Sequence, residues 1–367
     1  MGKLCIIAPE LGASFVDKHL NRIRPGETVA VVWYDRHPHA KMFQNTCPTL
    51  HLDAWAQQLS VRLARRAGLS LERMRARAVT RFLRSHDVEV VLGEFMDYCL
   101  EFVPLLERLG IPLVVQAHGY DVSGYLRGPR AAQEYLAYRS AKAILTRSEF
   151  HRRRLIELGL PTEKVHVNPG GVDIAALPPI RGADAAYRLL AIGRMVPQKA
   201  PIMLLEAFRL AAAREPRLML DYVGHGPMFD AVRMFITACG LEDRVLLHGT
   251  ASEETKHRLL LECGVFVQHS VTVPDVGNEE GLPAAIQEAM GAAMAVVSTR
   301  HTGIPEAVVE NEMGLLVDEG DVQGMAEAFL RIAPLVEEFG QAGYRKAAAT
   351  YTWEHEKARL ERSLGCG

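Results

Sequence analysis

The stretch that decides the fold is GGVDIAALPPIRGADAAYRLLAIGR, residues 170–194. Its first part is rich in Gly, Pro and Ala, which is typical of a linker between domains. Its last part, YRLLAIGR, is a short apolar run that begins a new series of strands. We therefore predict an N-terminal domain at residues 1–175, a linker at 176–186 and a C-terminal domain at 187–350.

Strand-like and helix-like segments alternate on both sides of this linker. The strand-like apolar runs lie at 4–9, 28–34, 88–93, 111–118, 141–148 and 164–169, and then at 187–194, 217–224, 244–249, 265–270, 294–299 and 313–318. This alternation indicates parallel sheets with helices on both faces. The predicted fold class is α/β, with two doubly wound, Rossmann-like domains facing a cleft and ligands outside the carboxyl ends of the strands. The end of the chain, 351–367, reads as a helix that we expect to pack back on the N-terminal domain.

Length and charge narrow the function classes. The chain has 367 residues, enough for two ordinary cores, with 49% hydrophobic and 23% charged residues. The net charge of -2 argues against a nucleic-acid-binding protein. Residues 1–175 carry a net charge of +6, and the remainder carries -8. A basic half suits an anionic partner such as a membrane surface or a lipid-phosphate acceptor, although arginine-rich helices that face water give the same pattern.

Cysteine spacing and hydropathy favour a reducing, aqueous location. The six cysteines, at 5, 47, 99, 239, 263 and 366, show no Cys-x-x-Cys spacing, so neither a zinc ribbon nor a redox dithiol is indicated. No apolar run is long enough to span a membrane, and the first residues read as a strand rather than a signal sequence. We expect a cytoplasmic protein with peripheral contact at the inner face of the membrane. The arginines expected to make that contact are Arg62, Arg65, Arg66, Arg73, Arg77, Arg81 and Arg84.

Candidate site residues follow the strands of the first half. Gly12 and Ser14 come after the first strand, where small residues let the backbone approach a ligand and a helix start favours anions. A plain strand–helix turn would have the same composition. In HGYD, His118 lies at a strand end from which it can reach a substrate hydroxyl or a developing charge. Asp121, in the same motif, is a weaker candidate for an acceptor contact.

The strand ends of the second half carry cations and glycines. In GRMVPQKA, Arg194 and Lys199 suit a diphosphate, with the guanidinium as a bidentate donor and the ammonium as a point charge. Two solvated surface cations are the alternative. Gly224, in VGHGP, permits a tight turn, and Gly249, at the end of RVLLHG, leaves room for a flat base against the backbone.

The motif NEEGLPAAIQEAM, residues 278–290, places one carboxylate before a predicted helix and one inside it. Pro283 suits the first helical turn, and the free N–H groups at the helix start form an anion site without a metal. Glu280 precedes that start, and Glu288 lies one to two turns further along. A carboxylate can accept hydrogen bonds from vicinal hydroxyls, so a sugar, a diphosphate and a ribose would lie along one helix start. A solvated glutamate at each position is the alternative.

Metal-bridged phosphate binding is not indicated. The chain contains no Asp-x-Asp pattern, so basic side chains and a helix dipole would have to hold a diphosphate. His37, His39 and His51 are close in sequence, and we interpret them as loop residues rather than a metal site. We expect no cofactor and no metal, since a nucleotide sugar would be a co-substrate.

These motifs together resemble the retaining nucleotide-sugar glycosyltransferases of family 4, which have the GT-B fold. The resemblance covers nearly the whole chain and is strongest over 187–318. Glu280 and Glu288 are similar to its E-x7-E motif, GRMVPQKA to its GR-L-x-x-x-K-G loop and VGHGP to its G-x-G-P turn. QAHGYDVS and SVTVPDVGNEEGLP resemble bacterial exopolysaccharide and lipopolysaccharide transferases of the colanic-acid type.

The resemblance implies transfer of a hexose, with retained configuration and without a metal, from a UDP- or GDP-linked donor. The implied acceptor is a glycan, lipid-linked or small-molecule hydroxyl, and the departing phosphate oxygen takes the acceptor proton. The residues implied are His118 and Glu280 for catalysis, Gly12, Arg194, Lys199, Gly224, Gly249, Gly281, Leu282, Pro283 and Glu288 for the donor, and Ser14 and Asp121 for the acceptor. Among them, Arg194 and Lys199 would bind the diphosphate and Glu288 the ribose. Glu280 would hold the sugar, and His118 would contact it near the anomeric centre.

The chain departs from the family pattern at a few positions. Ala200 follows Lys199 where glycine is usual, and Ala293 and Ala295 stand where the family commonly has Gly and Pro after the motif helix. The helix end is therefore expected to be shaped differently. Two other classes stay open on this architecture. One is a sugar phosphorylase or nucleotide-sugar epimerase, and the other is a non-catalytic nucleotide-sugar-binding protein.

Overall fold

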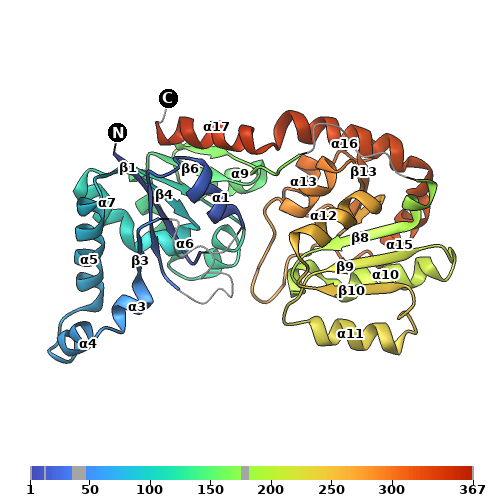
Figure 1. Cartoon of the computed structure of the whole chain (residues 1–367), viewed down its shortest axis with the longest axis horizontal. Coiled ribbons are helices and arrows are strands. Elements are labelled where there is room, and N and C mark those ends of the chain that lie inside the picture. Colours follow the sequence, from blue (N-terminus) through green and yellow to red (C-terminus); the bar gives the residue numbers. More distant parts are fainter. Residues whose placement is uncertain (1, 12–13, 35–46, 175–181, 366–367) are drawn as a thin grey trace. The chain divides into compact units, whose positions relative to one another are not determined.

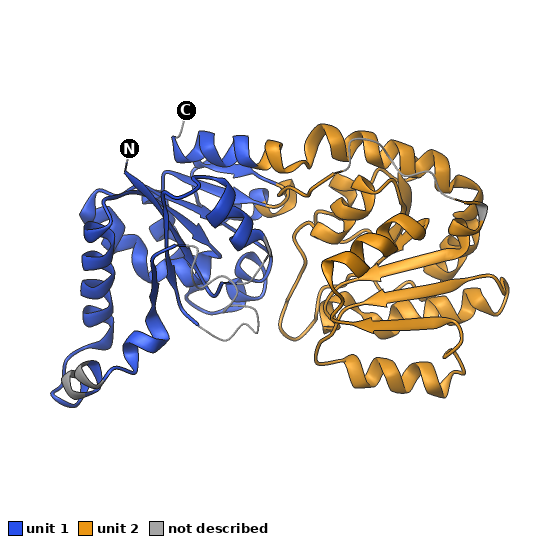
Figure 2. Ribbon diagram, viewed as in Figure 1, with its two compact units in different colours: residues 1–146, 152–168, 357–367 blue, residues 147–151, 169–356 orange. Residues whose placement is uncertain are grey.

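The computed structural model describes residues 2–11, 14–34, 47–174 and 182–365 (Figure 1). Gly12, His37, His39 and most of the predicted linker therefore lie outside the described residues. The chain divides into two compact units (Figure 2). Unit 1 comprises residues 1–146, 152–168 and 357–367, and unit 2 comprises residues 147–151 and 169–356. The short segment 147–151 thus groups with the second half of the chain, and the last eleven positions group with the first half.

Unit 1 contains a seven-stranded parallel sheet with the order β3-β2-β1-β4-β5-β6-β7. Its strands are β1 (Lys3–Ala8), β2 (Thr28–Val32), β3 (Thr49–His51), β4 (Val88–Glu94), β5 (Leu113–Gln116), β6 (Ala143–Thr146) and β7 (Val165–Val167). Six of these match the predicted apolar runs. The edge strand β3 was not predicted, because its three residues form no apolar run. His51 therefore ends a strand, and its interpretation as a loop residue is wrong.

The α-helices of the first half carry more than half of the lysines and arginines of that half. They are α1 (Ser14–Arg22), α3 (Leu52–Ala56), α4 (Leu59–Arg66), α5 (Leu71–Ser85), α6 (Met96–Cys99), α7 (Val103–Leu109), α8 (Ala131–Tyr135) and α9 (Glu149–Glu157). The helix predicted at the end of the chain is α17 (Trp353–Leu364). Within unit 1 its last residues are held by Lys142, whose Nζ donates to the carbonyl oxygen of Leu364 at 2.8 Å. In the described part of the chain, no helix combines the length and apolar character needed to cross a membrane.

Unit 2 contains a six-stranded parallel sheet with the order β10-β9-β8-β11-β12-β13. Its strands are β8 (Arg188–Ile192), β9 (Met219–Val223), β10 (Val245–Gly249), β11 (Val265–Val267), β12 (Ala295–Thr299) and β13 (Gly314–Val317). The accompanying helices are α10 (Pro201–Ala212), α11 (Phe229–Ala238), α12 (Glu253–Glu262), α13 (Ala284–Gly291), α14 (Ile304–Ala307), α15 (Val322–Arg331) and α16 (Val336–Thr350). All six strands match predicted runs, and the two doubly wound sheets confirm the predicted fold class.

The strands of unit 2 are apolar throughout because both faces of the sheet are covered. Leu189 and Ala191 of β8 point into one apolar cluster, and Leu190 between them points into another. The first cluster includes residues of α10, α11 and α15, and the second includes residues of α12, α13 and α14. This alternation has the two-residue period of a strand. Polar groups are consequently displaced to the strand ends, where the candidate site residues lie.

Two alanines stand at left-handed backbone positions. Ala200, before α10, has φ 38°, and Ala293, directly after the C-cap of α13, has φ 55°. Glycine adopts this region most easily, and a left-handed residue is a common way for a helix to end. At both places the chain therefore keeps a conformation that suits glycine, although the residue is alanine.

Candidate functional site

In unit 2 the predicted cation and carboxylate meet around the ammonium group of Lys199. Its Nζ lies 3.1 Å from Oε2 of Glu280 and donates to Oε1 of Gln268 at 3.2 Å. The Lys199 side chain passes directly over Gly193, the residue after β8. Both charged side chains are less than one-fifth exposed, so water screens their attraction only partly. The structure thus brings together Lys199 and Glu280, and it adds Gln268, which follows β11 and was not predicted.

Glu280 is held in place by a buried histidine that the sequence did not single out. The backbone N–H of Glu280 donates to Nε2 of His301 at 3.1 Å. The other ring nitrogen of His301, Nδ1, donates to Oε1 of Glu319 at 2.6 Å. A ring that donates from Nδ1 and accepts at Nε2 is the neutral tautomer. The hydroxyl of Thr302 also donates to the Glu280 carbonyl oxygen at 2.7 Å, so the segment before α13 is fixed from two sides.

The start of α13 offers unsatisfied backbone donors. Pro283 is the N-cap, so the helix begins at Ala284, one residue later than predicted. Across the described residues, the N–H groups of Gly281, Leu282, Ala284 and Ala285 find no hydrogen-bond acceptor. Gly281 and Leu282 are buried, and unpaired buried N–H groups are rare without a ligand or water. The helix start therefore provides donors and a positive dipole end for an anion.

The other glycine turns at this edge are in direct backbone contact. The N–H of Gly224 donates to the carbonyl oxygen of Gly249 at 2.8 Å. A Cβ on Gly224 would lie 1.9 Å from the carbonyl oxygen of Gly193, so the turns after β8 and β9 pack too closely for a side chain. Arg194, next to Gly193, is exposed, and no carboxylate of the described chain pairs with it. Its side chain is available for an anion.

Glu288, the second motif carboxylate, has a cation partner. Its Oε1 lies 3.2 Å from Nζ of Lys256 on α12, and the same ammonium lies 2.9 Å from Glu253. Burial favours a lower pKa for Lys256, but the charges of Glu288 and Glu253 outweigh it and raise that pKa above its usual value. Sequence reasoning missed Lys256, because no motif marks a lysine on the preceding helix.

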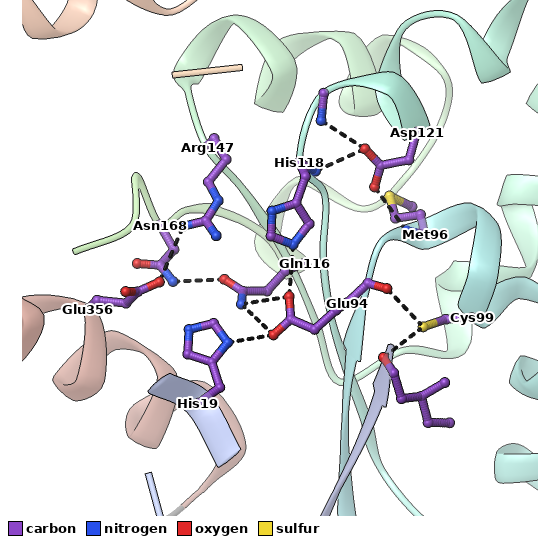
Figure 3. Close-up of polar contacts among 12 residues, drawn as sticks. His19, Glu94, Met96, Cys99, Gln116, His118, Asp121, Arg147, Asn168 and Glu356 are labelled. Atoms are coloured by element: carbon purple, nitrogen blue, oxygen red, sulfur yellow. Dashed lines mark hydrogen bonds and ion pairs between the residues drawn. The ribbon is translucent and has the colours of Figure 1, made fainter. Parts of the chain in front are cut away.

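In unit 1, His118 contacts a buried carboxylate that the sequence did not indicate (Figure 3). Glu94, the last residue of β4, is fully buried. Its Oε2 lies 2.8 Å from Nε2 of His118, and its Oε1 lies 2.6 Å from Nδ1 of His19 on α1. Burial would raise the pKa of Glu94, but the two histidines hold that pKa well below its usual range. The carboxylate is therefore charged at neutral pH.

Further polar groups at the carboxyl ends of the strands support this pair. Gln116 is the last residue of β5, and its Nε2 donates to Oε1 of Glu94 at 3.2 Å. Oε1 of the same Gln116 side chain accepts from Nδ2 of Asn168 at 3.0 Å. The ring of Phe95 lies against His118, with 4.2 Å between ring centroids. Phe95 has φ 68°, a strained conformation for a bulky residue, and such strain is characteristic of functional sites.

Asp121 fixes the loop that carries His118. Its Oδ1 accepts the backbone N–H groups of His118 and Gly119, each at 2.9 Å, and its Oδ2 accepts the N–H of Met96 at 2.9 Å. Both oxygens thus bind the backbone, and an acceptor contact for Asp121 stays a prediction. Ser14 begins α1, but its side chain, like Gly12, lies outside what is described.

The chemistry available in unit 2 is that of anion binding beside a carboxylate. Lys199, the α13 N–H groups and Arg194 can hold a diphosphate, and Glu280 can accept hydrogen bonds from sugar hydroxyls. Over residues 2–11, 14–34, 47–174 and 182–365, no group of three or more His, Cys, Asp or Glu side chains is arranged to hold a metal ion.

Two family models match the chain, one in each half. The model of Glycosyltransferase Family 4 matches residues 28–176, and that of Glycosyl transferases group 1 matches residues 180–345. A similar curated protein is the amylovoran biosynthesis glycosyltransferase AmsK of Erwinia amylovora, 30% identical over 59% of this chain and 54% of that protein. Another is a GDP-mannose-dependent alpha-(1-6)-phosphatidylinositol monomannoside mannosyltransferase of Mycolicibacterium smegmatis, 27% identical over 79% of each chain. The chain spans about half the length of the first curated relatives it matches.

Solved structures share the fold of the chain. The crystal structure of Anabaena HepE in complex with UDP aligns over 100% of both chains with a TM-score of 0.79 and 17% sequence identity. At this identity the likeness concerns the fold, which comprises two doubly wound domains.

Proposed function

We propose that this chain, whose two halves match the models of Glycosyltransferase Family 4 and Glycosyl transferases group 1, is a GT-B glycosyltransferase that transfers a sugar from a nucleotide-sugar donor to a hydroxyl acceptor. The proposed donor is UDP- or GDP-linked, since the Mycolicibacterium relative is named as GDP-mannose-dependent and HepE was crystallised with UDP. The proposed acceptor is a glycan, either free or lipid-linked, since the Erwinia relative is named for amylovoran biosynthesis. A small-molecule hydroxyl is the other acceptor we consider.

The observation that carries the proposal is the Lys199–Glu280 pair next to the unsatisfied N–H groups of Gly281 and Leu282. Glu280 pairs with the ammonium of Lys199 at 3.1 Å. A diphosphate would compete for that ammonium and would also bind the N–H groups. Glu280 would then be left to accept hydrogen bonds from the hydroxyls of the donor sugar. Preorganised charges of this kind supply most of the rate where negative charge develops on a leaving phosphate.

We propose a retaining, metal-independent reaction. The bond between the anomeric carbon and the phosphate oxygen breaks, and a bond from that carbon to the acceptor oxygen forms on the same face. The acceptor proton passes to the departing phosphate oxygen, so no side chain acts as a base. Arg194 and Lys199 stabilise the charge on the diphosphate, Glu288 binds the ribose, and His118 contacts the sugar near the anomeric carbon.

The test uses a panel of UDP- and GDP-hexoses with Glu280→Gln and Lys199→Met. We expect each variant to lose about 100-fold or more of transfer activity, the usual cost of one preorganised electrostatic contact. Asp230→Asn and Arg233→Met are the matched controls, because these residues form an exposed pair on α11 at 3.3 Å. Full activity in both site variants would overturn the assignment.

The same assay separates the alternative classes. Turnover that requires orthophosphate and no nucleotide would identify a phosphorylase. Isomerised donor without any transfer would identify an epimerase. Donor binding without transfer or hydrolysis would identify a binding protein. Proton NMR of the fresh product reports the anomeric configuration, and an inverted product would contradict the retaining reaction.

We also propose peripheral contact with anionic membranes through α4, α5 and α7. Arg77, Arg81 and Arg84 line a hollow of about 610 Å³. A neighbouring hollow of about 440 Å³ is lined by Arg77 and Arg84 together with Arg73 and Arg108. Within the described chain, none of these five guanidinium groups pairs with a carboxylate. Uncompensated arginines attract phosphate-bearing surfaces.

Co-sedimentation with liposomes tests this location. Vesicles that contain anionic lipid should bind the protein in a salt-dependent way, and neutral vesicles should not. Arg77→Ser combined with Arg84→Ser should weaken binding, whereas Arg258→Met should not. Binding that is absent, or that is insensitive to salt, would contradict the proposal.

A further inference from the structure

The charge on Glu94 must be compensated from within a small group of residues. Its carboxylate is fully buried, and a buried unpaired charge is strongly destabilising. The groups that reach its oxygens are Nδ1 of His19, Nε2 of His118 and the neutral amide of Gln116. Cys99 donates to the main-chain oxygen of Glu94 rather than to the carboxylate, and burial raises the pKa of its thiol, which stays neutral. A histidine therefore carries the compensating charge.

The two histidines differ in their surroundings. His19 is fully buried and lies closer to the carboxylate, at 2.6 Å against 2.8 Å for His118. Both hydrogen bonds have an ionised acceptor, and the shorter one is expected from the ring that is charged as well, which favours His19 as the imidazolium. His118 is one-tenth exposed and lies on the loop that Asp121 fixes, with the ring of Phe95 against it. The buried ring of His19 is thus suited to neutralise Glu94, and the partly exposed ring of His118 is suited to contact a substrate.

We propose that Glu94 is a positioning residue for His118, and that His19 supplies the positive charge that neutralises Glu94. His118 is then neutral, donates Nε2–H to Glu94, and presents Nδ1 as the acceptor of the ring. A carboxylate that receives one ring N–H fixes both the tautomer and the ring orientation, as it does for histidines that bind metals. The catalytic consequence rests on the proposed function, which assigns His118 to the donor sugar.

The neutral tautomer suits that assignment. Nδ1 of a neutral ring accepts a hydrogen bond from a sugar hydroxyl, whereas an imidazolium would place a positive charge near the anomeric carbon. That carbon becomes electron-deficient as its bond to phosphate breaks, so a nearby cation would raise the barrier. The shared carboxylate thus lets one buried histidine hold the charge while the other stays neutral.

Nuclear magnetic resonance of the full-length protein labelled with [15N]histidine tests the tautomer. The ring nitrogens would be assigned with His118→Gln and His19→Gln. At pH 7 we expect His118 to carry one proton, on Nε2, and His19 to carry protons on both nitrogens. A doubly protonated His118, or a neutral His118 with its proton on Nδ1, would overturn the proposal.

A mutation series tests the positioning role. Glu94→Gln should lower transfer about 10- to 100-fold, the usual cost of losing a group that orients a functional histidine. Glu89→Gln is the matched control, because Glu89 lies on the same strand in a partly exposed pair with Arg24. Glu94→Gln combined with His118→Ala should be no less active than His118→Ala alone. Additive losses, or an unchanged tautomer and rate in Glu94→Gln, would count against the proposal.

Thermal unfolding checks that each variant is folded. Glu94→Asp, which keeps the charge, is the second variant should Glu94→Gln not fold, and we expect it to retain the Nε2–H tautomer of His118. If the wild-type protein transfers no sugar, the proposed function fails, and the tautomer measurement still decides whether Glu94 orients His118.

Discussion

A methyl group at position 224 would collide with the neighbouring turn. Gly224 has φ 148°, and an added Cβ would lie 1.9 Å from the carbonyl oxygen of Gly193. We expect Gly224→Ala to lower the free energy of unfolding by roughly 2–4 kcal/mol, through overpacking and backbone strain. Gly182→Ala is the control, because no atom lies within 4 Å of its added Cβ. Equal midpoints of chemical denaturation for the two variants would refute this close packing.

Asp97 makes stability depend on pH. Burial and the nearby charge of Asp121 raise the pKa of Asp97 from 3.8 to about 7. Between these values the folded state binds the proton more tightly than the unfolded state, so this contribution to the free energy of unfolding falls as pH rises from about 4 to about 7. Asp97→Asn should therefore gain stability relative to the wild type over that range. The free energy of unfolding of both proteins would be measured by chemical denaturation at several pH values. A difference between Asp97→Asn and the wild type that stays constant from pH 4 to pH 7 would contradict the raised pKa.

The residues of the donor motif could be predicted, but their partners could not. Lys199 and Glu280 stand in motifs with recognisable spacing, and the structure places them 3.1 Å apart. Lys256 and Glu94 stand in no such pattern, because each meets its partner only when separate strands and helices pack together. For Glu94, a carboxylate that ends an apolar strand was the available signal, since a charge there requires a partner.

At the scale of elements, the two left-handed alanines are a source of strain. An L-residue in this region costs roughly 1–2 kcal/mol relative to glycine. Substitution by glycine relieves this strain but also removes the contacts of the alanine methyl group, so the net gain in stability is smaller. Ala200→Gly and Ala293→Gly should each raise the free energy of unfolding by about 0.5–1 kcal/mol. Ala292→Gly is the control, because its φ of −93° suits alanine, and that change should destabilise. Destabilisation by all three changes would contradict the assigned conformations.

Element type was predictable where the pattern was long and uniform. The buried strands are continuously apolar, and twelve such runs were expected where twelve strands lie. The thirteenth strand, β3, has three residues at a sheet edge, and of these Leu50 packs against the core, which is too little to form an apolar run. The helix α13 starts one residue later than predicted, because Pro283 can serve as either an N-cap or a first helical residue.

At the scale of the whole molecule, ligand binding should be visible as stability. A nucleotide sugar that binds the folded protein alone raises the free energy of unfolding by about 2.7 kcal/mol at a concentration one hundred times its Kd. We expect this increase to be the same with EDTA as with added Mg²⁺, since Lys199 and backbone N–H groups are proposed to hold the diphosphate. A shift that EDTA abolishes would contradict metal-independent donor binding.

Calorimetric titration of the full-length protein with UDP- and GDP-sugars measures whether a donor diphosphate binds beside Glu280. We expect that at least one donor binds the wild type, that Lys199→Met weakens its binding about 100-fold, and that Arg258→Met does not. Equal donor affinity in wild type and Lys199→Met would show that the diphosphate does not occupy the site beside Glu280.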